Sequence, residues 1–155
     1  MDEKGYLSKP SNHTTFTLEL FYKGKSVLNT GWFYDDTKST THYLLCWPER
    51  EPINIYKEKL ELEHIYCVEI MLINRVQLQS YLQSTLEIDA NSINENYSSL
   101  VSRKVTTTRD PGINYVYSDG LQEKPLNLML QKQKYLESGS VVAHYIVSEK
   151  CIKKL

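Results

Sequence analysis

The chain has 155 residues, of which 41% are hydrophobic and 24% are charged, and its formal charge is −1. These values are typical of a folded domain and exclude a disordered or collagen-like chain. The charge is evenly spread: residues 1–75 carry 9 basic and 11 acidic side chains, and residues 76–155 carry 9 and 8, so the chain lacks the basic excess of a dedicated duplex-binding protein.

The cellular location of the protein is predicted from three features that the sequence lacks: a signal peptide, a membrane helix and a CxxC motif. The opening sequence Met-Asp-Glu-Lys-Gly-Tyr lacks the apolar core of a signal peptide. The longest apolar stretch, residues 65–73, is far shorter than the roughly 20 residues of a membrane helix. The cysteines form no CxxC motif, and we expect them to be reduced, with Cys46 and Cys67 buried in strands and Cys151 near the C-terminus. We therefore expect a cytoplasmic protein that does not contact a membrane.

The first third of the chain shows patterns of β-structure. Residues 15–22 alternate between apolar and polar side chains, which is typical of a half-buried strand. A turn at residues 23–25 predicts that residues 26–34 return as the second arm of a hairpin. Residues 41–47 form a third apolar run, and Pro48 is expected to end that strand. A short strand is expected at 53–56.

The middle of the chain holds the clearest element, residues 64–73, in which both alternating faces are apolar. Such a strand is usually central in its sheet and covered on both sides. Asn74 follows as a helix N-cap, with Gln77 in the position of a capping box, and predicts a helix at 75–84. A second helix is expected at 90–103 with Asp89 as its cap, and both helices are expected to pack on this strand.

The last third returns to strands. The chain order predicts a strand at 113–117, a strand at 126–130 that runs into a short helix near Tyr135, a final strand at 141–147 and a tail at 151–155. Because strands come in neighbouring runs, we predict an α+β fold with a single mixed, largely antiparallel sheet of about six strands and two to three helices. Residues 1–155 are expected to form one globular domain.

Familiar catalytic motifs are missing from the sequence. There is no glycine-rich phosphate loop and no G-x-S-x-G, and the four histidines lack the spacing of metal ligands, which favours structural roles for them. Residues 124–155 contain six lysines but only two acidic residues, Glu137 and Glu149. They predict a solvated basic surface or, as the alternative, a local binding patch.

Two glutamates occupy unusual positions. Glu69 lies in the middle of the central apolar strand, where an ionised carboxylate must face a cleft, meet a Lys, Arg or His, or reach solvent at a strand end or sheet edge. Glu19 lies on the polar face of the first strand, where an exposed sheet surface is the alternative to a catalytic role. We treat both as candidate catalytic residues.

The chain has twelve tyrosines but three phenylalanines, a ratio that suits half-buried sheet faces and interfaces. Two interpretations stay open, an aromatic contact surface and ordinary strand packing. The residues concerned are Trp32, Tyr34, Tyr43, Trp47, Tyr115 and Tyr117.

The first third of the chain resembles the restriction-endonuclease-like proteins of the PD-(D/E)XK group. The resemblance rests on Asp2 followed by the segments Phe16-Thr17-Leu18-Glu19-Leu20, Gly31-Trp32-Phe33 and Thr40-Thr41-His42-Tyr43-Leu44-Leu45. It implies that Asp2 and Glu19 hold Mg²⁺. Phe21 stands where the family has its catalytic lysine, so Lys23 or Lys25 would have to replace that lysine.

Two functions follow as expectations. The resemblance implies a nuclease-like protein, active or inactive, that processes nucleic acid in a phage or mobile element, with Mg²⁺ as its cofactor. The alternative is a non-enzymatic accessory module that binds a protein partner through its tyrosine-rich surface.

Overall fold

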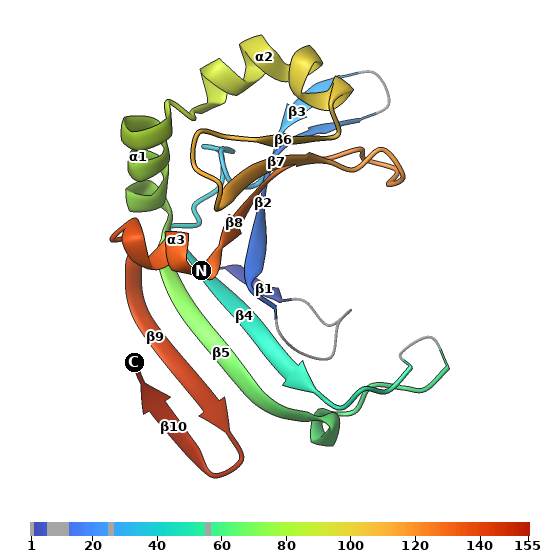
Figure 1. Ribbon diagram of the computed structural model, residues 1–155, viewed down its shortest axis with the longest axis vertical. Coiled ribbons are helices and arrows are strands. Elements are labelled where there is room, and N and C mark those ends of the chain that lie inside the picture. The colour runs from blue at the N-terminus through green and yellow to red at the C-terminus, as the bar shows by residue number, and fades with distance from the viewer. Residues whose placement is uncertain (1, 6–12, 25–26, 55–56) are drawn as a thin grey trace.

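The strands of this protein divide between two sheets that meet at one hydrophobic core (Figure 1). The computed structural model describes residues 2–5, for their backbone only, and residues 13–24, 27–54 and 57–155. Sheet A has the strand order β1 (Asp2–Gly5), β4 (His42–Arg50), β5 (Ile65–Asn74), β9 (Val141–Ser148) and β10 (Cys151–Lys154). Sheet B has the order β3 (Leu28–Thr30), β2 (Thr15–Lys23), β8 (Leu126–Gln131), β7 (Ile113–Tyr117) and β6 (Val105–Thr107).

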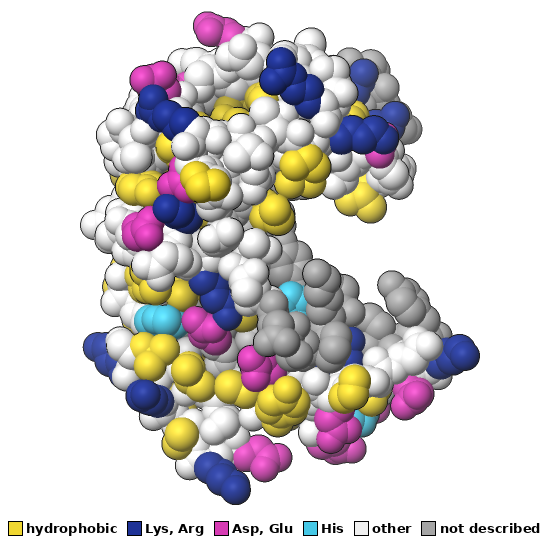
Figure 2. All heavy atoms as spheres, in the orientation of Figure 1, with side chains coloured by type: hydrophobic (Ala, Val, Ile, Leu, Met, Phe, Trp, Pro, Cys, Tyr) yellow, Lys and Arg dark blue, Asp and Glu magenta, His cyan; other side chains and the backbone are white. Residues whose placement is uncertain are grey.

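The α+β class is confirmed, but the single sheet is not. All neighbouring strands pair antiparallel except β1 and β4, which are parallel. The chain changes sheet four times: between β1 and β2, between β3 and β4, between β5 and β6, and between β8 and β9. Figure 2 shows the result as two arms with a hollow between them.

Both predicted helix caps are confirmed. The Asn74 side chain accepts a hydrogen bond from the Gln77 amide at 3.0 Å and begins α1 (Arg75–Leu86). Asp89 and Ser92 form a reciprocal capping box that begins α2 (Ala90–Ser102), with the Ser92 amide 2.8 Å from the Asp89 carboxylate. A third helix, α3 (Lys132–Glu137), follows β8 directly, and a 3-10 turn, η1 (Leu62–His64), precedes β5.

The helices do not cover the central strand as expected. α1 continues from the end of β5, whereas α2 packs against β6 and β7 of sheet B. Figure 1 shows α1 and α2 along the arm that holds sheet B, while β4, β5, β9 and β10 extend away from them.

The core lies between the inner face of sheet A and the apolar face of sheet B. Trp47 of β4 contacts the ring of Phe16 of β2 edge to face, with 5.6 Å between ring centroids. Its indole N–H donates to the Thr15 carbonyl at 2.9 Å, and the Tyr135 hydroxyl of α3 donates to the Phe16 carbonyl at 3.3 Å. Buried Arg75 donates to the Phe33 carbonyl and forms an ion pair with Asp36 at 3.1 Å. The bond from Trp47 to Thr15 joins the two sheets directly, and the other bonds attach α3 and α1 to their surroundings.

Strand ends differ from the expectations in three places. β4 continues through Pro48 to Arg50, because β1 pairs only with residues 43–46 and leaves β4 without a described neighbour on that side at the proline. The tail at 151–155 contains a strand, β10, which pairs with β9. Ile53 and Asn54 are not in a strand, and the rest of the strand expected there, residues 55–56, lies outside the described residues.

The remaining strands largely follow the expectations. β2, β5, β7, β8 and β9 are confirmed, the expected return arm at 26–34 is only the short β3, and β6 was not expected. Among the residues that the structure describes, no helix is both long and apolar enough to cross a membrane.

Candidate functional site

Glu69 lies on the inner face of β5, between Trp47 on β4 and Ile146 on β9. Its carboxylate forms an ion pair with the Lys132 ammonium at the start of α3 and lies 2.9 Å from the His144 ring nitrogen Nε2 on β9. The Lys132 ammonium also lies 5.0 Å from the centroid of the Trp47 ring. The sequence left three possibilities for Glu69: a cleft, a basic partner or solvent. The structure shows the basic partners, Lys132 and His144.

The electrostatics of this cluster stabilise an ionised Glu69. Burial alone would raise the pKa of the Glu69 carboxyl, but hydrogen bonds from Lys132 and His144 and their charges hold it below its usual value. The side chains are 24% exposed for Glu69 and 13% for His144. A carboxylate with a lowered pKa that accepts two hydrogen bonds is a poor proton acceptor. The cluster therefore fits a structural link between α3 and sheet A better than it fits a general base.

Glu19 and Lys23 lie on opposite sides of β2. A β-bulge between Glu19 and Phe21 reverses the alternation, so Phe21 pairs with Leu126 on the buried side and Tyr22 takes the side of Glu19. Lys23 is exposed at the strand end, where its amide donates to the Glu123 carbonyl at 2.8 Å. The bulge thus keeps Lys23 from the position of the family's lysine.

The expected metal site is not assembled from the described side chains. Glu19 is on sheet B and Glu69 on sheet A; Lys25 and the side chain of Asp2 lie outside the described residues. Among the described residues, no group of three or more His, Cys, Asp or Glu side chains is placed to hold a metal ion. The amide of Trp32 donates to the Glu19 carboxylate at 3.4 Å, so that carboxylate has a backbone partner.

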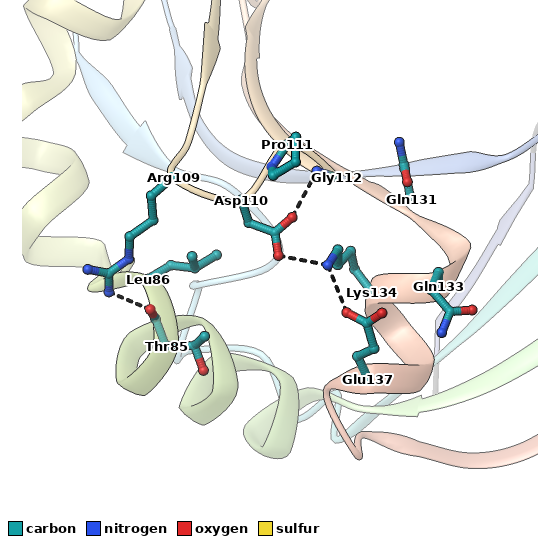
Figure 3. Close-up of a pocket in the computed structure, with 10 residues that line it drawn as sticks. All are labelled: Thr85, Leu86, Arg109, Asp110, Pro111, Gly112, Gln131, Gln133, Lys134 and Glu137. Carbon is teal, nitrogen blue, oxygen red and sulfur yellow. Dashed lines mark hydrogen bonds and ion pairs between the residues drawn. The ribbon is translucent and has the colours of Figure 1, made fainter.

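A second charged cluster lines an open pocket of about 660 Å³ between the end of α1, the β6–β7 loop and α3 (Figure 3). The Lys134 ammonium lies 2.8 Å from both the Asp110 and the Glu137 carboxylates, and these bonds raise its pKa. Arg109 donates to the Thr85 carbonyl and faces Glu87 at 3.6 Å. Figure 3 shows the Asp110, Lys134 and Glu137 groups pointing toward one another. One ammonium group is thus shared by two carboxylates, and all three side chains are held by one another.

The six aromatic residues singled out in the sequence do not form a contact surface. Tyr43 and Trp47 are fully buried, and the others pack against the core. The Tyr43 hydroxyl donates to the Trp32 carbonyl, and the Tyr34 hydroxyl to the Ile88 carbonyl, both at 3.0 Å. Burial raises the pKa of Tyr115 to about 12. All six residues therefore take part in packing, and Trp32, Tyr34, Tyr115 and Tyr117 remain half-buried.

The cysteines are free but less buried than expected. Cys46 and Cys67 are half-buried, and Cys151 is exposed. Burial and the nearby Glu49 and Glu69 carboxylates raise the pKa of the Cys67 thiol, which lowers its reactivity.

The unusual surface of this protein is the outer face of sheet A, which points away from sheet B. The outer face consists of seven side chains from three adjacent strands: Val68, Ile70, Leu72, Ala143, Tyr145, Val147 and Ile152. Register pairs Ile70 with Tyr145, and Val68 with Val147, so these side chains form continuous rows. Six are half-buried, and Ile152 is 73% exposed.

The contrast within β5 shows that the described residues bury this face only in part. Met71 and Ile73 point inward and are 0% exposed, whereas Val68, Ile70 and Leu72 alternate with them on the same strand and remain accessible. β5 has a paired strand on each side, so the partial accessibility of its outward side chains means that no described residues form a complete layer above them. The expectation that β5 is covered on both sides is therefore wrong for its outer side.

The sequence contained the signal for this face, because residues 65–73 are apolar on both alternating sides. Periodicity shows that both faces avoid water, but it cannot show what covers each of them. Comparison with known proteins does not supply an answer: no family model, no curated protein and no solved structure matches the chain.

Proposed function

We propose that this chain is a protein-binding module and that an apolar helix of a partner protein docks on the outer face of sheet A. One observation carries the proposal: on the middle strand of the sheet Val68, Ile70 and Leu72 stay only half-buried, although strands pair with it on both sides. A sheet that is apolar on both faces is normally covered by a layer of helices or by another sheet. The described part of the chain covers only the inner side.

The size of the outer face favours a helix over a second copy of the chain. The three strands span about 10 Å between the axes of β5 and β10, and the rows from Leu72 to Val68 extend about 14 Å along the strands. With side-chain margins this gives an area on the order of 300 Å², well below the roughly 800 Å² per partner of a stable protein interface. The dimensions match the 10–12 Å diameter of one helix. We therefore expect a transient complex.

The binding test uses two variants with a similar chemical change in different places. Ile70→Lys adds a charge to the outer face, and Val76→Lys adds the same charge to α1, where Val76 is already 62% exposed. Proteins cross-linked to the wild type in extract of the producing cells are identified, purified and titrated against each variant. We expect Ile70→Lys to lose binding of the purified partner and Val76→Lys to retain it, with both variants folded by circular dichroism.

Two results would overturn the proposal. Equal binding by Ile70→Lys and wild type would place the partner elsewhere. A wild-type dimer in sedimentation velocity that Ile70→Lys abolishes would make a second copy the occupant.

The nuclease-like activity that the resemblance implies has its own assay. Purified protein is incubated with DNA or RNA and Mg²⁺ or Mn²⁺, beside Glu19→Gln. Since the β2 bulge separates Glu19 from Lys23, we expect no metal-dependent cutting. Cutting by wild type that Glu19→Gln abolishes without loss of structure would establish the nuclease instead.

A further inference from the structure

The β9–β10 hairpin carries three lysines that have no ion-pair partner among the described residues, Lys150, Lys153 and Lys154. The three remaining lysines of this region differ: Lys132 is bound to Glu69, Lys134 to Asp110 and Glu137, and Lys124 lies at the distant end of sheet B beside Lys23. The hairpin lysines are solvent-exposed, and the only acidic residue within the hairpin is Glu149. The basic surface expected from the sequence is therefore concentrated at one margin of sheet A.

The register connects this margin to the outer face. Ile152 pairs with Val147, and Lys154 pairs with Tyr145, so Lys154 and Ile152 lie on the same side as the apolar rows. Lys153 alternates to the inner side, and Lys150 lies in the turn between the strands. Lys154 thus places one positive charge on β10 at the border of the apolar patch.

We propose that the partner helix carries Asp or Glu residues along the flank that meets β10, beside an apolar stripe that covers Val68, Ile70 and Leu72. The inference rests on the proposed function, because it names the chemistry of the helix that the outer face binds. Carboxylates at helical spacing on one flank would face Lys154 and the turn, while the stripe contacts the sheet. Because Lys154 lies at the β10 margin, it also favours one flank of the helix turning toward β10.

The surface charges affect the rate of association more than the stability of the final complex. An exposed pair contributes little in salt, and the attraction decreases as ions screen it over about 8–10 Å. The acidic flank therefore predicts binding that weakens with added salt. An apolar stripe alone would predict binding that salt leaves unchanged or strengthens.

The experiment titrates the protein with two dye-labelled helical peptides of about 18 residues. Both carry the same leucine stripe, and one flank carries glutamates in the first peptide and lysines in the second. Fluorescence anisotropy is measured for wild type, Ile70→Lys, Lys154→Glu and the control Lys59→Glu, which makes the same charge change at an 83% exposed loop lysine. Circular dichroism confirms that each variant is folded.

We expect wild type to bind the glutamate peptide up to about fivefold more tightly than the lysine peptide, since one exposed ion pair contributes at most about that factor. Lys154→Glu should reduce or reverse this preference, Lys59→Glu should keep it, and Ile70→Lys should weaken both peptides.

The outcomes separate the two proposals. If Ile70→Lys weakens binding while wild type and Lys154→Glu treat the two peptides alike, the docking face stands and the acidic flank is rejected. If Ile70→Lys binds both peptides as wild type does, or if wild type binds neither, the docking face itself is rejected.

Discussion

The two sides of β5 belong to the same strand, share the same neighbours and have similar side chains, yet they have opposite surroundings. Met71 and Ile73 are sealed between the sheets, while Ile70 and Leu72 meet solvent one residue away. The inner side stabilises the fold, because its burial is complete within the chain. The outer side contributes less to folding and retains its apolar area for a partner. Similar sequence thus serves folding on one side and, as we propose, recognition on the other.

The largest expected effect tests this contrast directly. Met71→Ala should destabilise the protein by about 2–5 kcal/mol, because it leaves a cavity in a fully buried site. Ile70→Ala should cost about 1 kcal/mol, since solvent already reaches that side chain. Urea unfolding of both variants measures the difference, with unchanged m-values as the control. Equal losses would mean that the outer side is covered after all.

A smaller effect is expected at Glu69, which lies on the inner side of β5 but is only partly buried. Glu69→Ala should lower the free energy of unfolding by about 1–3 kcal/mol, because Lys132 and His144 lose their acceptor while half-buried. Glu69→Gln keeps the shape and one acceptor oxygen, and should cost less. Denaturant unfolding of both variants gives these values. No loss in either variant would remove the structural role that we assign to this cluster.

The smallest expected effect is the pH dependence of the same group. Because the folded-state pKa of Glu69 is lowered, its contribution is complete above the usual value of about 4.3 and is lost as the pH falls through the folded-state pKa. The stability difference between wild type and Glu69→Gln should therefore shrink between about pH 5 and pH 2. Thermal melts across this range test it. A difference that grows on acidification would show that the pKa is raised instead.

The sequence was informative wherever the signal is local. Alternation identified β2, and the N-caps Asn74 and Asp89 placed the starts of α1 and α2, because a cap acts within three residues of itself. β6 and β10 were missed because three or four residues with polar or lysine side chains carry no periodic signal, and pairing with β7 and β9 forms these strands.

The division into two sheets depends on contacts that no local pattern contains. Nothing near residues 15–22 indicates that β2 pairs with β8 rather than with β4. For the same reason the partners of Glu69 could be named by type but not by residue, because His144 is 75 positions away. The bulge in β2 likewise appears only in the register with β8, and it determines that Lys23 faces away from Glu19.

The pairing of β2 with β8 also constrains how the protein is made. The Tyr135 hydroxyl that fastens α3 to β2 reaches the Phe16 carbonyl 119 positions earlier in the chain. At a translation rate of about 5–20 residues per second, the ribosome needs roughly 6–24 s to deliver β8 and α3 after β2 has been made. During that interval one edge of β2 pairs with β3 while the other edge waits for β8, and its apolar side can contact only earlier elements such as Trp47 of β4. The nascent chain therefore depends on its last quarter to bury its first long strand.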